Sequence, residues 1–134
     1  MIMMKQDNVI LKTINLKKYF PLIRDIFFRV KVHNRAVDGI GLAIRRREIF
    51  GLVGESGCGK TTLGKLIVRL EEPTDGKIIF EGKDLTNLKK KDDIKRFRRK
   101  VQMIFQNPYN SFDPRLRVLD SLSEALIVQG ITDK

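Results

Sequence analysis

The chain has 134 residues, enough for one domain and too few for two ordinary domains. Hydrophobic residues make up 42% and charged residues 32%, a balance typical of a soluble globular protein. No apolar run is long enough to cross a bilayer, residues 1–8 lack a secretory signal, and Cys58 is the only cysteine. We therefore expect a cytoplasmic protein without membrane spans or disulfides.

The formal net charge is +11 at pH 7, and three explanations fit it. The partner could be a nucleic acid, or it could be an acidic protein or the anionic face of a membrane. The third explanation is a longer protein whose remainder carries the acidic residues. The basic residues are spread along the chain, with one dense block at 89–100 and no interleaved aromatic pair for base stacking, which favours the third explanation.

The first elements in chain order are two predicted strands. Residues 9–18 alternate loosely and predict an edge strand that stops at Pro21, because proline cannot donate to a ladder. Tyr19 and Phe20 at its exit are ordinary core candidates, although an aromatic ring there could also stack on an adenine. Residues 21–35 have no clean period and are interpreted as an inserted loop or a connector. Residues 36–44 predict the second strand.

A glycine-rich stretch follows. The apolar run at 49–53 predicts a buried parallel strand, and the apolar spacing after Lys60 predicts a helix that ends near Leu70. Between them, Gly54, Gly59, Lys60 and Thr61 match the phosphate-binding loop pattern. Glycines let backbone N–H groups converge around phosphate oxygens, and the start of the helix favours negative charge there.

Each functional group in this loop has a predicted role. Lys60 would reach the β- and γ-phosphates, Thr61 would bind Mg²⁺ through its hydroxyl, and Thr62 is placed for another phosphate oxygen. For Cys58, a reactive thiol at a helix start competes with a small side chain that simply fits, and we favour the latter. The ordinary alternative for the whole motif is a glycine-rich turn with a surface lysine.

The rest of the chain predicts short elements. Residues 71–76 have turn composition, 77–80 read as a strand, and 81–84 close it. Residues 88–100 favour a helix with a solvated basic face, 101–106 a buried strand, and 107–114 a loop. Apolar residues from 118 to 126 then recur at helical spacing.

Three stretches together resemble the ATP-binding cassette transporter ATPases, and within them the oligopeptide and dipeptide importer branch. They are the phosphate loop, residues 36–39 (Ala-Val-Asp-Gly) and residues 105–108 (Phe-Gln-Asn-Pro). The resemblance implies an α/β fold, a P-loop NTPase nucleotide-binding domain of the ABC type, in truncated form. It would comprise N-terminal antiparallel strands, a partial parallel core and the start of a helical subdomain. Residues 1–106 would form the ATP-binding core portion, and 107–134 the Q-loop and the start of that subdomain.

The resemblance also implies a set of site residues, with ATP and Mg²⁺ as cofactors. Phe20 matches the aromatic residue that stacks on adenine, with Tyr19 as the alternative because the alignment can slip by one. Gln106 matches the glutamine that touches Mg²⁺ or the attacking water, although by spacing alone a strand-end capping role stays open. Lys60 and Gln106 would be catalytic, and Thr61 and Gln106 would contact the metal. The triphosphate loop would comprise Gly54, Glu55, Ser56, Gly57, Cys58, Gly59, Lys60, Thr61 and Thr62.

The sequence departs from the family in two ways. Arg47 stands where a glycine usually precedes Glu48, so a turn that favours positive φ is expected to be either strained or rebuilt. The Leu-Ser-Gly-Gly-Gln signature, the strand ending in Asp-Glu and the switch histidine are missing, so we expect this chain to bind ATP weakly and not to hydrolyse it. An apolar sheet surface and an open edge would also make its folding marginal.

The complete protein implied by the resemblance is an ATPase at the inner face of the cell membrane. It would hydrolyse ATP together with a second ATPase subunit, drive membrane permease subunits, and serve an extracytoplasmic substrate-binding protein indirectly, with no nucleic-acid partner. A basic module that grips RNA or anionic lipid through residues 45–47 and 89–100 is the alternative from another class. A truncated, non-hydrolysing ATP binder and another P-loop enzyme, such as a small-molecule kinase, are further alternatives.

Overall fold

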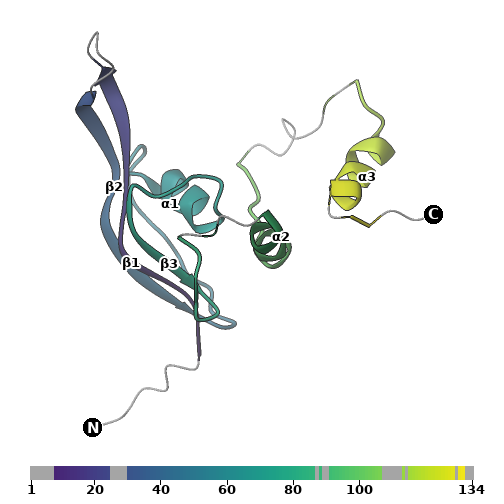
Figure 1. Ribbon diagram of the computed structural model, residues 1–134, viewed down its shortest axis with the longest axis horizontal. Coiled ribbons are helices and arrows are strands. Elements are labelled where there is room, and N and C mark those ends of the chain that lie inside the picture. Colours follow the sequence, from purple (N-terminus) through teal and green to yellow (C-terminus); the bar gives the residue numbers. More distant parts are fainter. Residues whose placement is uncertain are drawn as a thin grey trace. The chain divides into compact units, whose positions relative to one another are not determined.

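The computed structural model describes residues 8–24, 30–86, 88, 91–106, 113, 115–128 and 130–131. The chain divides into two compact units, Met1–Lys90 and Lys91–Lys134, and each is described by itself. Figure 1 follows the described elements along the chain, from purple to yellow. The first unit holds β1 (Val9–Arg24), β2 (Val30–Arg45), α1 (Lys60–Ile67), β3 (Asp75–Phe80) and β4 (Lys83–Asp84). The second holds α2 (Lys91–Lys100) and α3 (Val118–Val128).

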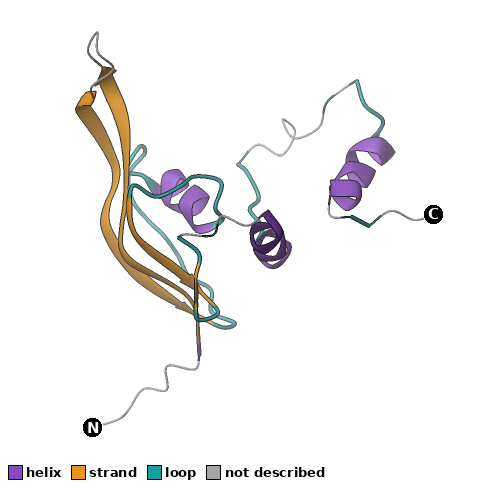
Figure 2. Ribbon diagram, in the orientation of Figure 1, coloured by secondary structure: helices purple, strands orange, loops and turns teal. Residues whose placement is uncertain are grey.

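The first unit is built on an antiparallel sheet with the strand order β2-β1-β3-β4. The centre of the sheet is the N-terminal part of β1, where Leu11 lies opposite Ile44 of β2 and Phe80 of β3. Figure 2 shows β1 and β2 as a long, curved pair of strands. The pairing is interrupted by several register shifts, which bend the strands and change the direction of their side chains.

The described part of β1 and β2 is longer than predicted. Pro21 lies inside β1, opposite His33, so the prediction that the strand stops there is wrong. Beyond Lys17, which pairs with Asp75 at the start of β3, the register gives β1 a partner on the β2 side only. Among the described residues, no strand pairs with the other edge of β1 beyond Lys17, and an unpaired edge is where a strand tolerates proline. Interpreting residues 21–35 as a loop or connector was also wrong for 21–24, which continue β1, and for 30–35, which begin β2, while residues 25–29 lie outside the described part of the chain.

The hydrophobic core of the first unit lies between the sheet and α1. Leu16 and Ile78 from the strands and Leu66 from α1 are its largest fully buried side chains. Leu63, on the same face of α1 as Leu66, is also buried, and α1 packs against β2. Residues 63 and 66 share a helix face because they are three positions apart. This packing fixes the start of α1, and hence the end of the glycine-rich loop, beside β2.

The buried parallel strand predicted at 49–53 and the buried strand predicted at 101–106 do not form in the described structure. Residues 49–53 and 101–105 carry no regular secondary structure. Ile49 is 101% exposed, Val53 95% and Ile104 91%. A parallel strand is stable when neighbouring strands and covering layers bury both of its faces, and the described strands are all antiparallel to their partners. The antiparallel part of the expected fold is therefore confirmed, whereas both strand assignments are wrong for this structure.

The helices begin and end close to the predicted positions. The helix predicted from Lys60 to about Leu70 ends at Ile67, and the chain leaves it through Arg69, which has a positive φ of 57°. The helix predicted at 88–100 begins at Lys91, and the one predicted over 118–126 is α3. β3 begins at Asp75, two residues earlier than expected. Most of the predicted loop at 107–114 lies outside the described residues.

The charges of α2 follow the direction of its helix dipole. Asp92 and Asp93 lie in its first turn, while Arg98, Arg99 and Lys100 lie in its last turn. Negative charge at the start of a helix and positive charge at its end are each stabilising. Within the described ranges, no helix has both the length and the apolarity needed to cross a membrane.

Candidate functional site

The glycine-rich loop at 54–59 reaches α1 through a close contact with β2. Gly59 caps α1 with a φ of 95° and makes no side-chain capping hydrogen bond. A Cβ atom at this position would lie 2.1 Å from the carbonyl oxygen of Ala36. Both the positive φ and this approach to the backbone require glycine. The sequence thus brings the loop against residues 36–37 of β2.

The side chain of Lys60 lies inside the loop. Its ammonium nitrogen donates hydrogen bonds to the carbonyl oxygens of Gly54, at 2.6 Å, and Glu55, at 2.5 Å. It also lies 3.5 Å from the sulfur of Cys58. A Cβ at Gly54 would lie 2.7 Å from that sulfur, so glycine at 54 leaves the space that Cys58 occupies. The carbonyl groups of the loop therefore hold the ammonium group of Lys60 in place.

The start of α1 is suited to an anion. The first turn of the helix carries no acidic residue, and a helix start has orphan N–H groups and a partial positive charge. The loop itself is exposed up to Cys58, Thr61 is exposed and Thr62 is half-buried. A phosphate group would meet Lys60 and these hydroxyls without displacing a core side chain. The chemistry of the predicted loop residues thus fits a phosphate chain.

A cavity of about 320 Å³ connects this loop to β2. Cys58, Gly59 and Lys60 line it from the loop side, and Arg35 and Asp38 line it from β2. The cavity is therefore bordered by the predicted phosphate-binding groups at one side and by a pair of opposite charges at another.

Tyr19 reaches this cavity through Asp38. The Tyr19 hydroxyl donates to Oδ1 of Asp38 at 2.5 Å, and the Arg35 guanidinium lies 3.4 Å from Oδ2 and 5.6 Å from the centre of the Tyr19 ring. The hydrogen bond from Tyr19, with the nearby Arg35 charge, lowers the pKa of Asp38. The same hydrogen bond raises the pKa of Tyr19, because deprotonation would remove the donated hydrogen. The three groups form one coupled cluster.

Phe20 has a different neighbour. The ammonium nitrogen of Lys18 lies 4.9 Å from the centre of the Phe20 ring and donates to the carbonyl oxygen of Glu72. Of the two aromatic candidates, it is Tyr19 that contacts a residue lining the cavity. Sequence reasoning gave no role to Arg35 and used Asp38 only as part of a family resemblance. The pairing of β1 with β2 would have identified Arg35, because it places residue 35 opposite residue 19.

Gln106, the other predicted catalytic residue, is exposed and follows α2 in the second unit. Thr61 belongs to the first unit, so the predicted approach of Gln106 to Thr61 and Mg²⁺ stays a prediction. The residues that follow it, 107–110, lie outside the described part of the chain.

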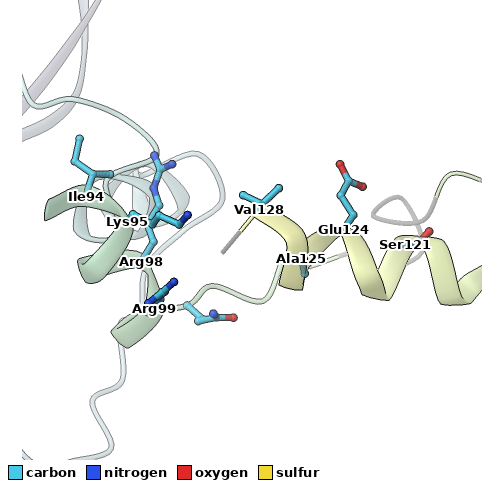
Figure 3. A pocket seen from close by; sticks show the side chains of 9 residues that line it. Ile94, Lys95, Arg98, Arg99, Ser121, Glu124, Ala125 and Val128 are labelled. Atoms are coloured by element: carbon cyan, nitrogen blue, oxygen red, sulfur yellow. The ribbon is translucent and has the colours of Figure 1, made fainter. Parts of the chain in front are cut away.

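The basic residues of the alternative function have carboxylate neighbours. Arg45 lies 3.9 Å from Glu48, and Arg46 lies 3.1 Å from Glu81. In the second unit, a cavity of about 750 Å³ lies between α2 and α3 (Figure 3). Its lining mixes basic side chains of α2, such as Lys95, with Glu124 of α3. Carboxylate groups thus lie among the basic residues at both places, which reduces the positive charge available to an RNA or a lipid surface.

Comparison with known proteins gives consistent matches. Residues 37–133 match the protein family described as ABC transporter. The oligopeptide transport ATP-binding protein AppF of Bacillus subtilis (strain 168) is 41% identical over 118 residues, which cover 88% of this chain and 36% of the relative. The dipeptide transport ATP-binding protein DppF of Escherichia coli (strain K12) is 40% identical over 126 residues, covering 93% and 37%. The chain thus spans little more than a third of the length of these curated relatives.

Solved structures show the same similarity. A dimeric bacterial ABC transporter cassette matches with a TM-score of 0.72 and 25% identity, over 89% of this chain and 47% of that one. A dimeric ATP-binding cassette in a post-hydrolysis state, bound to ADP and Pi, matches with a TM-score of 0.74 and 25% identity, over 92% and 50%.

Proposed function

Because this chain belongs to the ABC transporter family, we propose that it is the N-terminal part of the ATP-binding subunit of a peptide importer and that it binds Mg-ATP. The observation that carries this proposal is the position of Lys60. Its ammonium group is hydrogen-bonded to two loop carbonyls at the start of α1, which has no side-chain cap, beside a cavity that reaches β2. A positive charge, a helix start and a glycine-rich backbone in one place favour binding of a phosphate chain.

Separate groups of residues would bind the phosphates, the Mg²⁺ ion and the base. Residues 54–59 and Lys60 would bind the phosphates, Thr61 would offer its hydroxyl to Mg²⁺, and Thr62 would contact a further phosphate oxygen. Tyr19 would provide the surface for the base, because its hydroxyl is bonded to Asp38 at the cavity, with Phe20 as the alternative. Bound Mg²⁺ would neutralise charge on the phosphate oxygens.

The function of the complete protein extends this proposal. AppF and DppF are named as oligopeptide and dipeptide transport ATP-binding proteins. By analogy, the complete protein would hydrolyse ATP together with a second ATPase subunit, at the inner face of the membrane. It would drive permease subunits that receive peptides from an extracytoplasmic binding protein. Gln106 would sense this reaction at Mg²⁺ or the attacking water.

The test is stabilisation of this chain by nucleotide. A ligand at a hundred times its Kd stabilises a fold by about 2.7 kcal/mol, which raises the melting temperature of a domain of this size by several degrees. We expect millimolar Mg-ATP to raise the melting temperature of the wild-type chain, and Lys60→Ala to abolish the increase because the phosphates lose their cation.

Lys65→Ala is the matched control. Lys65 lies on the same helix, in its last turn, so this variant removes one positive charge from α1 away from the loop. It should keep the full response to Mg-ATP. Equal melting curves of the wild-type chain with and without Mg-ATP, or an equal increase for Lys60→Ala, would contradict the proposal.

A further inference from the structure

Asp38 joins two side chains at the edge of the loop cavity. One of its carboxylate oxygens accepts a hydrogen bond from the Tyr19 hydroxyl at 2.5 Å. The other accepts one from the Arg35 guanidinium at 3.4 Å. Asp38 and Arg35 line the same cavity as Lys60. The carboxylate therefore links an aromatic ring of β1 to the border of the predicted nucleotide site.

The backbone of β2 explains why Asp38 can do this. Between the pairs Leu16↔Ile40 and Lys18↔Val37 the register shifts, and β2 has one residue more than β1. Gly39, next to Asp38, has a φ of 72°, a conformation that glycine adopts without strain. An extra residue of this kind turns the neighbouring side chains out of their regular alternation. The irregularity thus aims Asp38 at Tyr19.

Asp38 also fixes the cation that lies over the ring. The guanidinium carbon of Arg35 lies 5.6 Å from the centre of the Tyr19 ring, a distance at which a cation and an aromatic face attract each other. The Arg35 side chain is 70% exposed, and its ion pair with the Asp38 carboxylate holds the guanidinium beside the ring. The ammonium group of Lys60, in contrast, is held by loop carbonyls and does not depend on Asp38.

We propose that Asp38 is a positioning residue for nucleotide binding: it holds the Tyr19 phenol and the Arg35 guanidinium at the mouth of the cavity and so fixes the surface on which the purine base stacks. This inference rests on the proposed function. It assigns to Asp38 an effect on the base and none on the phosphates.

Two ligands separate these effects. Mg-ATP carries a base and phosphates, whereas Mg-tripolyphosphate carries phosphates alone. We expect Asp38→Ala to bind Mg-ATP about five- to tenfold more weakly than the wild-type chain by titration calorimetry, a part of the affinity that a stacked base contributes. Binding of Mg-tripolyphosphate should stay within about twofold, since its contacts lie at the loop. Asp38→Asn should recover part of the ATP affinity, because its amide oxygen still accepts the Tyr19 hydroxyl.

Variants of the two aromatic residues complete the set. Tyr19→Ala should weaken Mg-ATP binding at least as much as Asp38→Ala does, and Asp38→Ala added to Tyr19→Ala should cause no further loss, since the residue it positions is already gone. Phe20→Ala tests the alternative stacking residue, and the inference expects it to weaken Mg-ATP binding less than Tyr19→Ala does.

The phenol itself offers a readout that a purely structural role would not change. Tyr19 and Tyr109 are the only tyrosines in the sequence, so Tyr109→Phe leaves one phenol to follow by ultraviolet absorbance. Around Tyr19, Asp38 raises the pKa of the phenol, while Lys17 and Arg35 lower it. In the Tyr109→Phe background, Asp38→Ala should therefore lower the pKa of Tyr19.

The outcomes are distinguishable. If the wild-type chain binds neither ligand, or binds both as well after Lys60→Ala, the proposed function fails and this inference fails with it. If the wild-type chain binds Mg-ATP through Lys60, three results would overturn the inference alone. They are an unchanged ATP affinity of Asp38→Ala, an equal loss for Mg-ATP and Mg-tripolyphosphate, and a selective loss of ATP binding in Phe20→Ala with none in Tyr19→Ala.

Discussion

Arg47 holds a backbone conformation that suits glycine. Its φ is 61°, in the left-handed region, where the Cβ of a non-glycine residue crowds the following carbonyl oxygen. The turn is closed by the neighbouring residues, since Glu48 accepts a hydrogen bond from the Arg45 N–H at 2.6 Å and Arg46 pairs with Glu81. We therefore expect the left-handed conformation of Arg47 to cost free energy. The positive φ expected at this position is confirmed, while the strain itself stays a prediction.

Arg47→Gly should raise the stability of the chain. Relief of left-handed strain is worth about 1 kcal/mol, offset in part by the larger backbone freedom of glycine in the unfolded state. We expect an increase of a few degrees in melting temperature, measured by circular dichroism.

Arg46→Gly serves as the control for this change. It replaces the adjacent arginine, which does not have a positive φ and which pairs with Glu81 at 3.1 Å. This variant should not be stabilised. An unchanged or lower melting temperature for Arg47→Gly would contradict the account of the turn.

At the scale of elements, Thr13 connects the two central strands through its side chain. It is 2% exposed, donates its hydroxyl hydrogen to the Ile40 carbonyl and accepts the N–H of Leu42, both at 3.1 Å. Directly after Thr13, between Thr13 and Leu16, the register of the β1–β2 pair shifts. The hydroxyl thus satisfies backbone groups at a place where the regular ladder is about to break.

Thr13→Val should destabilise the sheet by about 1 to 3 kcal/mol, because it keeps the shape of the side chain and leaves two backbone groups without their partner. Thr13→Ser keeps the hydroxyl and loses one methyl group, which costs about 0.8 kcal/mol. Chemical unfolding followed by circular dichroism gives both free energies. A valine variant as stable as the serine variant would show that the two hydrogen bonds contribute little.

These register shifts also explain which elements the sequence could predict. The starts of α1 and of the glycine-rich loop follow from local chemistry, since glycines, Lys60 and apolar residues at helical spacing stand next to each other. The β1–β2 hairpin beyond residue 20 was missed because each shift interrupts the alternation of side chains on which strand prediction depends. The cluster of Tyr19, Arg35 and Asp38 was missed for the same reason, since only the pairing of β1 with β2 brings it together.

At the scale of the whole molecule, the buried hydrophobic side chains of the described residues lie in the first unit, around its antiparallel sheet, except for Phe97 of α2. The sequence predicted buried strands at 49–53 and 101–106 from their apolar composition alone. Composition cannot show whether a strand has neighbours, and a parallel strand depends on them. Ile49 and Ile104 are consequently exposed, while Ile78 in β3, between β1 and β4, is fully buried. The folding stability of this chain should therefore depend on the residues around α1 and β3.

Identical substitutions at buried and exposed isoleucines test this arrangement. Ile78→Val removes one methylene group from a side chain that is 0% exposed and should cost about 1 kcal/mol, because the contacts of that group in the core are lost. Ile49→Val makes the same chemical change in a side chain that is 101% exposed, so the free energy of unfolding should stay unchanged. Urea unfolding of both variants beside the wild-type chain provides the comparison. A loss at position 49 as large as that at position 78 would mean that residues 49–53 are packed in solution, as the expected parallel strand would be.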